Sequence, residues 1–133
     1  RYYYRTAINM FPDIEIYIKN IDLVRIEQWL NLHFDSVSGK EISQHFLLEV
    51  TYQQHATEVH YLHNAARGQF SCLWFKHNQT PWPTDLDCAR SAADFLKTEV
   101  RCSDGSWQEP DQEQDQNWYS LKGGLTTKIR WND

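Results

Sequence analysis

Four side chains able to ligate a metal lie close together in the chain: His55, Glu58, His60 and His63. The surrounding alternation predicts a strand, on which His60 and His63 point to opposite faces because their spacing is odd. Zinc needs three or four converging ligands, and its helical signature H-E-x-x-H is absent. We therefore expect surface or turn histidines here, and no metal or other cofactor.

Other sequence motifs of catalytic sites are absent or incomplete. The sequence holds no G-x-S-x-G elbow and neither glycine-rich phosphate motif, and the nearness of Cys72 to His77 in sequence does not indicate contact. Acid–base chemistry needs two carboxylates that distant parts of a chain bring together. Glu49 and Glu58, on neighbouring predicted strands, could face each other in this way or simply be solvated.

The segment 104–116 is unusually acidic. It holds five acids and no base, and Asp111, Glu113 and Asp115 recur at every second position. A calcium loop would also need a glycine at its sixth place and a glutamate at its twelfth, where Lys122 stands. We expect either a solvated loop or a contact surface for a basic partner, because clustered charge of one sign speeds association with the opposite sign.

Two tryptophans lie outside the predicted regular elements, Trp82 between two prolines and Trp107 in the acidic segment. Tryptophan is enriched at binding hot spots, and it equally often fills a core beneath a loop. The candidate residues for partner binding are therefore aromatic or acidic: Trp82, Trp107, Glu109, Asp111, Glu113 and Asp115.

The elements that must position these residues are short strands and two helices. Residues 13–19 alternate as a half-buried strand, and residues 23–34 form a helix that Asp22 can cap. Turn chemistry at 36–39 precedes strands at 46–52, 59–62 and 70–76, the last central in the sheet, with turns at 53–57 and 64–68. A capping box from Thr84 to Asp87 begins a second helix, which ends near Lys97.

Strands at 99–103, 118–122 and 125–131 follow, and the last two are joined by the tight-turn signal Gly123-Gly124. The order β-α-β-β-β-α-β-β-β predicts an α+β fold: a mostly antiparallel sheet with two helices packed on one face. The uncovered face could hold a ligand or a second copy of the chain. Candidate pocket residues there are aromatic: Tyr52, His60, Tyr61 and Trp74.

Composition limits the function classes. The 133 residues fit one domain, for which we take 10–133, and Arg1–Asn9 are predicted to be an extension or tag-derived segment before the only methionine, Met10. A net charge of −5 without a basic run argues against nucleic-acid and membrane-surface binding. Three widely spaced cysteines indicate buried thiols and a reducing compartment, so we expect a cytoplasmic, bacterial-type protein.

Two hypotheses of function remain. The first is a non-catalytic protein-interaction module, such as an inhibitor, an immunity-like factor or an adaptor, that binds a basic partner. The alternative is a small-molecule-binding protein, or an enzyme without a diagnostic motif, that uses the aromatic sheet face. A homodimer is expected as well, because residues 70–76 are apolar on both faces.

Overall fold

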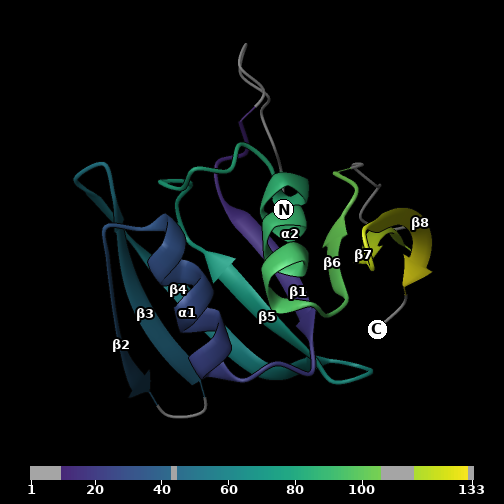
Figure 1. The fold of residues 1–133 in the computed structure, drawn as a ribbon, viewed down its shortest axis with the longest axis horizontal. Coiled ribbons are helices and arrows are strands. Elements are labelled where there is room, and N and C mark those ends of the chain that lie inside the picture. The colour runs from purple at the N-terminus through teal and green to yellow at the C-terminus, as the bar shows by residue number, and fades with distance from the viewer. Residues whose placement is uncertain (1–9, 43–44, 106–115, 132–133) are drawn as a thin grey trace, which may run out of the picture.

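The fold is one curled sheet with two helices on the same face (Figure 1). The structure, a computed structural model, describes residues 10–42, 45–105 and 116–131. Its elements are β1 (Ile14–Lys19), α1 (Leu23–His33), β2 (Ser36–Ile42), β3 (His45–Tyr52), β4 (His55–Ala66), β5 (Phe70–Phe75), α2 (Asp85–Leu96), β6 (Val100–Ser103), β7 (Gln116–Lys122) and β8 (Leu125–Trp131). The expected α+β class is confirmed.

The eight strands lie in the order β2-β3-β4-β5-β1-β6-β7-β8, and each neighbouring pair is antiparallel. β1 comes first in the chain and yet lies between β5 and β6. β5 lies fourth in the sheet, with three strands on one side and four on the other, so the prediction that it is central is confirmed. A strand in this position is buried on both faces, which explains its run of apolar residues.

Alternation along β1 divides the two faces of the sheet. Ile14, Ile16 and Ile18 are fully buried beneath the helices, and Ile16 lies opposite Leu73 of β5. Glu15 and Tyr17 point to the face that carries no helix, because successive side chains of a strand alternate. We call this second surface the helix-free face.

The two helices begin in different ways. The hydroxyl of Thr84 accepts a hydrogen bond from the backbone N–H of Asp87, which confirms the predicted cap of α2. Asp22 occupies the corresponding position of α1, but its side chain makes no capping hydrogen bond. α1 buries Ile26, Trp29 and Leu30, whereas α2 buries small residues that let it approach the sheet closely.

One strand was not predicted. Residues 36–39 do not form a turn but begin β2, in which Val37 lies opposite Val50. The error came from interpreting Gly39 as a turn residue. A Cβ atom at Gly39 would lie 2.6 Å from Cε1 of Phe46, so the glycine is there to let an aromatic ring approach the backbone.

The β3–β4 turn is tighter than predicted, whereas the β7–β8 turn agrees with the prediction. Gln53 and Gln54, at φ of 51° and 72°, form the whole β3–β4 turn, so β4 begins earlier than predicted and continues through a bulge to Ala66. Gly123 and Gly124, at φ of 59° and 81°, form the predicted two-residue turn between β7 and β8.

The sheet curls strongly at its β8 end (Figure 1). Trp131 of β8 therefore reaches Phe70 of β5, with ring centroids 5.0 Å apart, although three strands separate β5 from β8 in the sheet. Phe70 and Cys72, on the helix-free face of β5, are only 2% and 6% exposed within this one chain. The expectation of a homodimer rested on these residues, and it stays a prediction.

All three cysteines, Cys72, Cys88 and Cys102, are buried thiols, as the sequence indicated. Burial raises the pKa of the Cys88 thiol well above its ordinary value, and the charges of Asp85, Cys102 and Asp87 act in the same direction. Among the described residues, no helix has the length and apolar character needed to cross a membrane.

Candidate functional site

The acidic segment, residues 104–116, is the first candidate from the sequence. Trp107, Glu109, Asp111, Glu113 and Asp115 lie outside the described residues. The interpretation of that segment as a contact surface stays a prediction from the sequence.

Two acidic residues that precede the segment 104–116 in the sequence, Asp85 and Glu99, have structural roles. Asp85 is only 1% exposed, and its Oδ1 accepts a hydrogen bond from the backbone N–H of Glu15 at 3.0 Å. Glu99 accepts hydrogen bonds from Nε of Arg101 at 2.8 Å and from the hydroxyl of Ser120 at 2.5 Å. These two carboxylates are thus committed to contacts within the chain.

Glu99 is nevertheless charged. Burial alone would raise the pKa of Glu99, but hydrogen bonds from Ser120 and Arg101 and the positive charges of Arg101 and Lys19 hold it below the ordinary value. The buried charge is therefore stabilised by its neighbours.

Trp82 belongs to the core and not to a surface. It is 7% exposed and stacks on Trp29, with ring centroids 5.0 Å apart. Its ring also packs against Phe34 and Phe75. Of the two interpretations that the sequence left open for Trp82, this geometry corresponds to the core residue.

The four aromatic candidates divide between the two faces of the sheet. His60 and Trp74 lie together on the helix-free face, with ring centroids 5.3 Å apart. Tyr52 and Tyr61 lie on the helix-covered side, where Tyr52 packs against Phe34 and the hydroxyl of Tyr61 donates to the carbonyl oxygen of Ile21. The sequence already indicated the position of Tyr61. It lies two residues after the buried Val59 on the same strand, so both side chains point to the same face.

Glu49 and Glu58 do face each other. They are directly opposite residues of β3 and β4 on the helix-free face, and both are exposed. Oε1 of Glu58 lies 3.3 Å from Nε2 of His60 and 3.9 Å from Nζ of Lys76. Leu47 lies opposite His60, so an apolar and aromatic strip borders the two glutamates.

We call this group, Leu47, Glu49, Glu58, His60 and Trp74, the carboxylate–aromatic patch. Two further contacts order it: His45 stacks on His60 with ring centroids 5.5 Å apart, and Nε1 of Trp74 donates to Oδ2 of Asp13 at 2.8 Å. The patch therefore presents rigid rings beside two water-exposed carboxylates.

The three histidines of residues 55–63 are spread out in the structure. His60 belongs to the patch, whereas His63 contacts the hydroxyl of Tyr61 at 3.1 Å and His55 is exposed beside the β3–β4 turn. Within residues 10–42, 45–105 and 116–131, no group of three or more His, Cys, Asp or Glu side chains could hold a metal ion.

A second cluster lies under the curled β7–β8 hairpin. The guanidinium of Arg101 lies between Phe70 and Trp131, 4.5 Å and 4.7 Å from their ring centroids. The hydroxyl of Tyr17 donates to Glu15 at 3.1 Å, and burial, followed by the charges of Cys72 and Glu15, raises the pKa of Tyr17 far above its ordinary value. These rings and charges stabilise the curl, and the tyrosine stays protonated.

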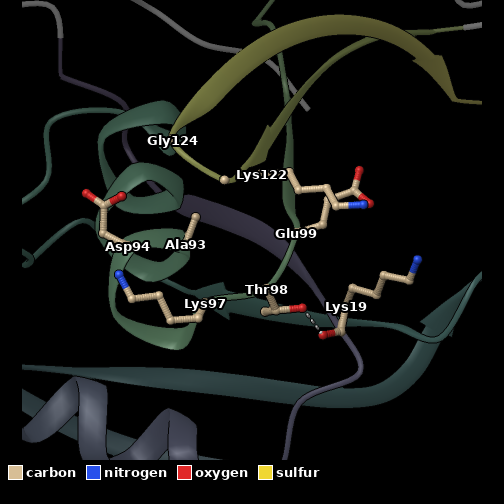
Figure 2. Close-up of a pocket in the computed structure, with 9 residues that line it drawn as sticks. Lys19, Ala93, Asp94, Lys97, Thr98, Glu99, Lys122 and Gly124 are labelled. Carbon is tan, nitrogen blue, oxygen red and sulfur yellow. Dashed lines mark hydrogen bonds between the residues drawn. The ribbon is translucent and has the colours of Figure 1, made fainter.

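A recess that the sequence did not suggest lies between α2 and the β7–β8 turn (Figure 2). Its volume is about 430 Å³. The residues that line it come from three separate segments: Lys19, Ala93, Asp94, Lys97, Thr98, Glu99, Lys122, Gly123 and Gly124. Only the fold brings these lysines together, because the sequence separates Lys19 from Lys122 by most of the chain.

Comparisons with known proteins give no family. The chain matches no protein-family model, and neither a curated protein nor a solved structure is significantly similar to it.

Proposed function

We propose that the protein is a non-catalytic protein-interaction module that binds a basic partner, as an inhibitor, an immunity-like factor or an adaptor would. One observation carries the proposal. Two exposed glutamates, Glu49 and Glu58, lie directly opposite each other on the face of the sheet that no helix covers.

Like charges directly opposite on a sheet destabilise it by roughly 0.2–1 kcal/mol. Lys76 offsets part of this cost at Glu58, although the 3.9 Å contact is exposed and therefore weak. Among the described residues, no hydrogen bond or ion pair involves the Glu49 side chain. An ammonium or guanidinium group from a partner, placed between the two carboxylates, would remove the repulsion.

The aromatic neighbours fit the same kind of partner. Trp74 and His60 present ring surfaces beside the carboxylates, and Asp13 fixes the indole of Trp74 through its N–H. An arginine or lysine side chain can pack its stem on such rings while its charge reaches an acid. Rigid rings also lose little entropy on binding, which favours them as anchors.

The exposure of the carboxylates supports binding over catalysis. A catalytic pair works best where water is excluded and where burial separates the pKa values of acid and base. Glu49 and Glu58 lie on an open sheet surface instead. The acids of residues 109–115 would add to the attraction of a basic partner from a distance.

The alternative remains a small-molecule site on the aromatic sheet face, supported by the contact between His60 and Trp74. We also propose a cytoplasmic location, because three buried thiols suit a reducing compartment.

The test is a titration of the ¹⁵N-labelled protein with a synthetic peptide of about ten residues rich in arginine and lysine, followed by NMR. We expect shift changes centred on β3, β4 and β5. Glu49→Gln and Glu58→Gln should each weaken binding about three- to tenfold, since each removes one charge pair.

The matched control is Glu41→Gln, which removes an exposed carboxylate on β2 from the opposite side of the sheet. It should leave the affinity for the peptide unchanged. Equal losses in all three variants would mean that only net charge matters, and shift changes away from β3–β5 would place the contact elsewhere; both outcomes contradict the proposal.

A further inference from the structure

We propose that the recess between α2 and the β7–β8 turn binds a small organic phosphate. The recess is distinct from the carboxylate–aromatic patch, because it lies beside β1, β6 and β7 and the patch lies on β3, β4 and β5. The two proposals can therefore fail separately.

The size of the recess indicates a small molecule. A volume of about 430 Å³ falls within the range of ligand pockets, which is roughly 300–1,000 Å³. Small residues leave this space open, since Ala93, Thr98, Gly123 and Gly124 form part of the wall. A Cβ atom added at Gly123 or Gly124 would meet no atom within 4 Å.

The charge of the lining indicates an anion. Three lysines face the recess from β1, from the C-terminus of α2 and from the end of β7, in a chain whose net charge is −5. Figure 2 shows Lys97 on one side of the space and Lys19 with Lys122 on the other. The lysines thus border the recess on two sides, and their flexible side chains would turn inward to contact a ligand.

The two acids of the lining do not cancel the lysines. Glu99 is already paired with Arg101 at 2.8 Å and hydrogen-bonded by Ser120, so its charge is balanced inside the protein. Asp94 is exposed at the rim, on the same side as Lys97 (Figure 2). Together with Arg101, the three lysines give four positive charges against the two acids, an excess of two that suits a dianion such as a phosphate ester.

The backbone at Lys97 adds a second observation. Lys97 ends α2 in the left-handed conformation, with φ 58° and ψ 41°. Glycine is the usual residue there because it has no Cβ to strain the backbone. The left-handed backbone at Lys97 fixes where its side chain leaves the main chain, and that side chain borders the recess.

The ligand needs an organic part as well as the phosphate. The recess is far larger than an inorganic phosphate ion, and the aliphatic stems of the lysines with Ala93 offer a surface to a small polar carbon skeleton. The hydroxyl of Thr98 already donates to the carbonyl oxygen of Lys19 at 2.8 Å, which fixes this wall before a ligand arrives.

Calorimetric titration tests the proposal with three probes: glucose 6-phosphate, inorganic phosphate and uncharged glucose. We expect glucose 6-phosphate to bind with a Kd of about 1 mM or lower, inorganic phosphate more weakly, and glucose not at all. Lys122→Gln should weaken binding of the ester about tenfold, because it removes one charge-assisted contact.

Lys97→Gly separates binding from folding. Glycine suits the left-handed conformation, so this variant should unfold at an equal or higher denaturant concentration while binding the ester about tenfold more weakly. The control is Lys40→Gln on β2, an exposed lysine at the other end of the sheet, which should bind like the wild type.

Absence of ester binding at about 10 mM would overturn the proposal. A loss in Lys40→Gln equal to that in Lys122→Gln would do the same, since it would show attraction to net charge alone. Inorganic phosphate binding as tightly as the ester would refute the organic part of the ligand.

Discussion

Among single residues, His33 shows how packing changes the pKa of a side chain. Its ring lies 5.2 Å from that of Trp82 between centroids, and its Nε2 lies 3.3 Å from the hydroxyl of Ser91. Burial lowers the pKa of His33, because the aromatic surroundings disfavour the charged imidazolium. The folded protein therefore favours the neutral form of this histidine.

A pH dependence of stability follows. Below the unfolded pKa of about 6.5, the unfolded chain takes up a proton at His33 more readily than the folded one does. The free energy of unfolding should thus fall as the pH drops from about 7.5 to about 5.5. His33→Gln should reduce that fall in denaturant titrations, whereas His77→Gln, at an exposed position, should not. Equal falls in both variants would contradict the assignment.

At the scale of elements, local signals predicted local structure well. The Thr84–Asp87 capping box and the Gly123-Gly124 turn each depend on a few adjacent residues, and both are present in the structure. β2 was missed because Gly39 has a long-range role against Phe46, which resembles a turn signal when only neighbouring residues are considered.

Structural features that depend on contacts between distant parts of the chain could not be predicted from the sequence. The curl that brings Trp131 onto Phe70 depends on strands that are far apart in the chain. Strand alternation, in contrast, already separates Tyr61 from His60, because it places Tyr61 on the same face as the buried Val59. The sequence left the facing of Glu49 and Glu58 open, because it placed the turn at 53–57, whereas Gln53 and Gln54 alone form the turn and set the register.

Helix capping offers a test at this scale. Thr84→Ala should lower the free energy of unfolding by about 1 kcal/mol, since it removes the hydrogen bond to the N–H of Asp87. Asp22→Ala changes the same position of α1, where the side chain makes no such bond, so it should cost less. Equal losses on urea denaturation would show that the hydrogen bond at Thr84 contributes nothing specific.

At the scale of the whole molecule, charge is divided between two regions. The helix-free face carries an opposed pair of glutamates on β3 and β4, and three lysines border the recess near β7. The β7–β8 hairpin itself carries Lys122, Lys128 and Arg130 and no acid. Under the two proposals, a chain with a net charge of −5 would offer one surface to a cationic partner and another to an anionic ligand.

Denaturant unfolding of Glu49→Gln and the wild type, each with and without the arginine-rich peptide, tests whether the two facing glutamates bind a basic partner. Relief of the repulsion should make the variant about 0.2–1 kcal/mol more stable than the wild type in the absence of peptide. The peptide should then stabilise the wild type more than the variant, because at one peptide concentration the stabilisation increases with the affinity for the folded state. A variant that is less stable than the wild type, or equal stabilisation of both by the peptide, would contradict the account.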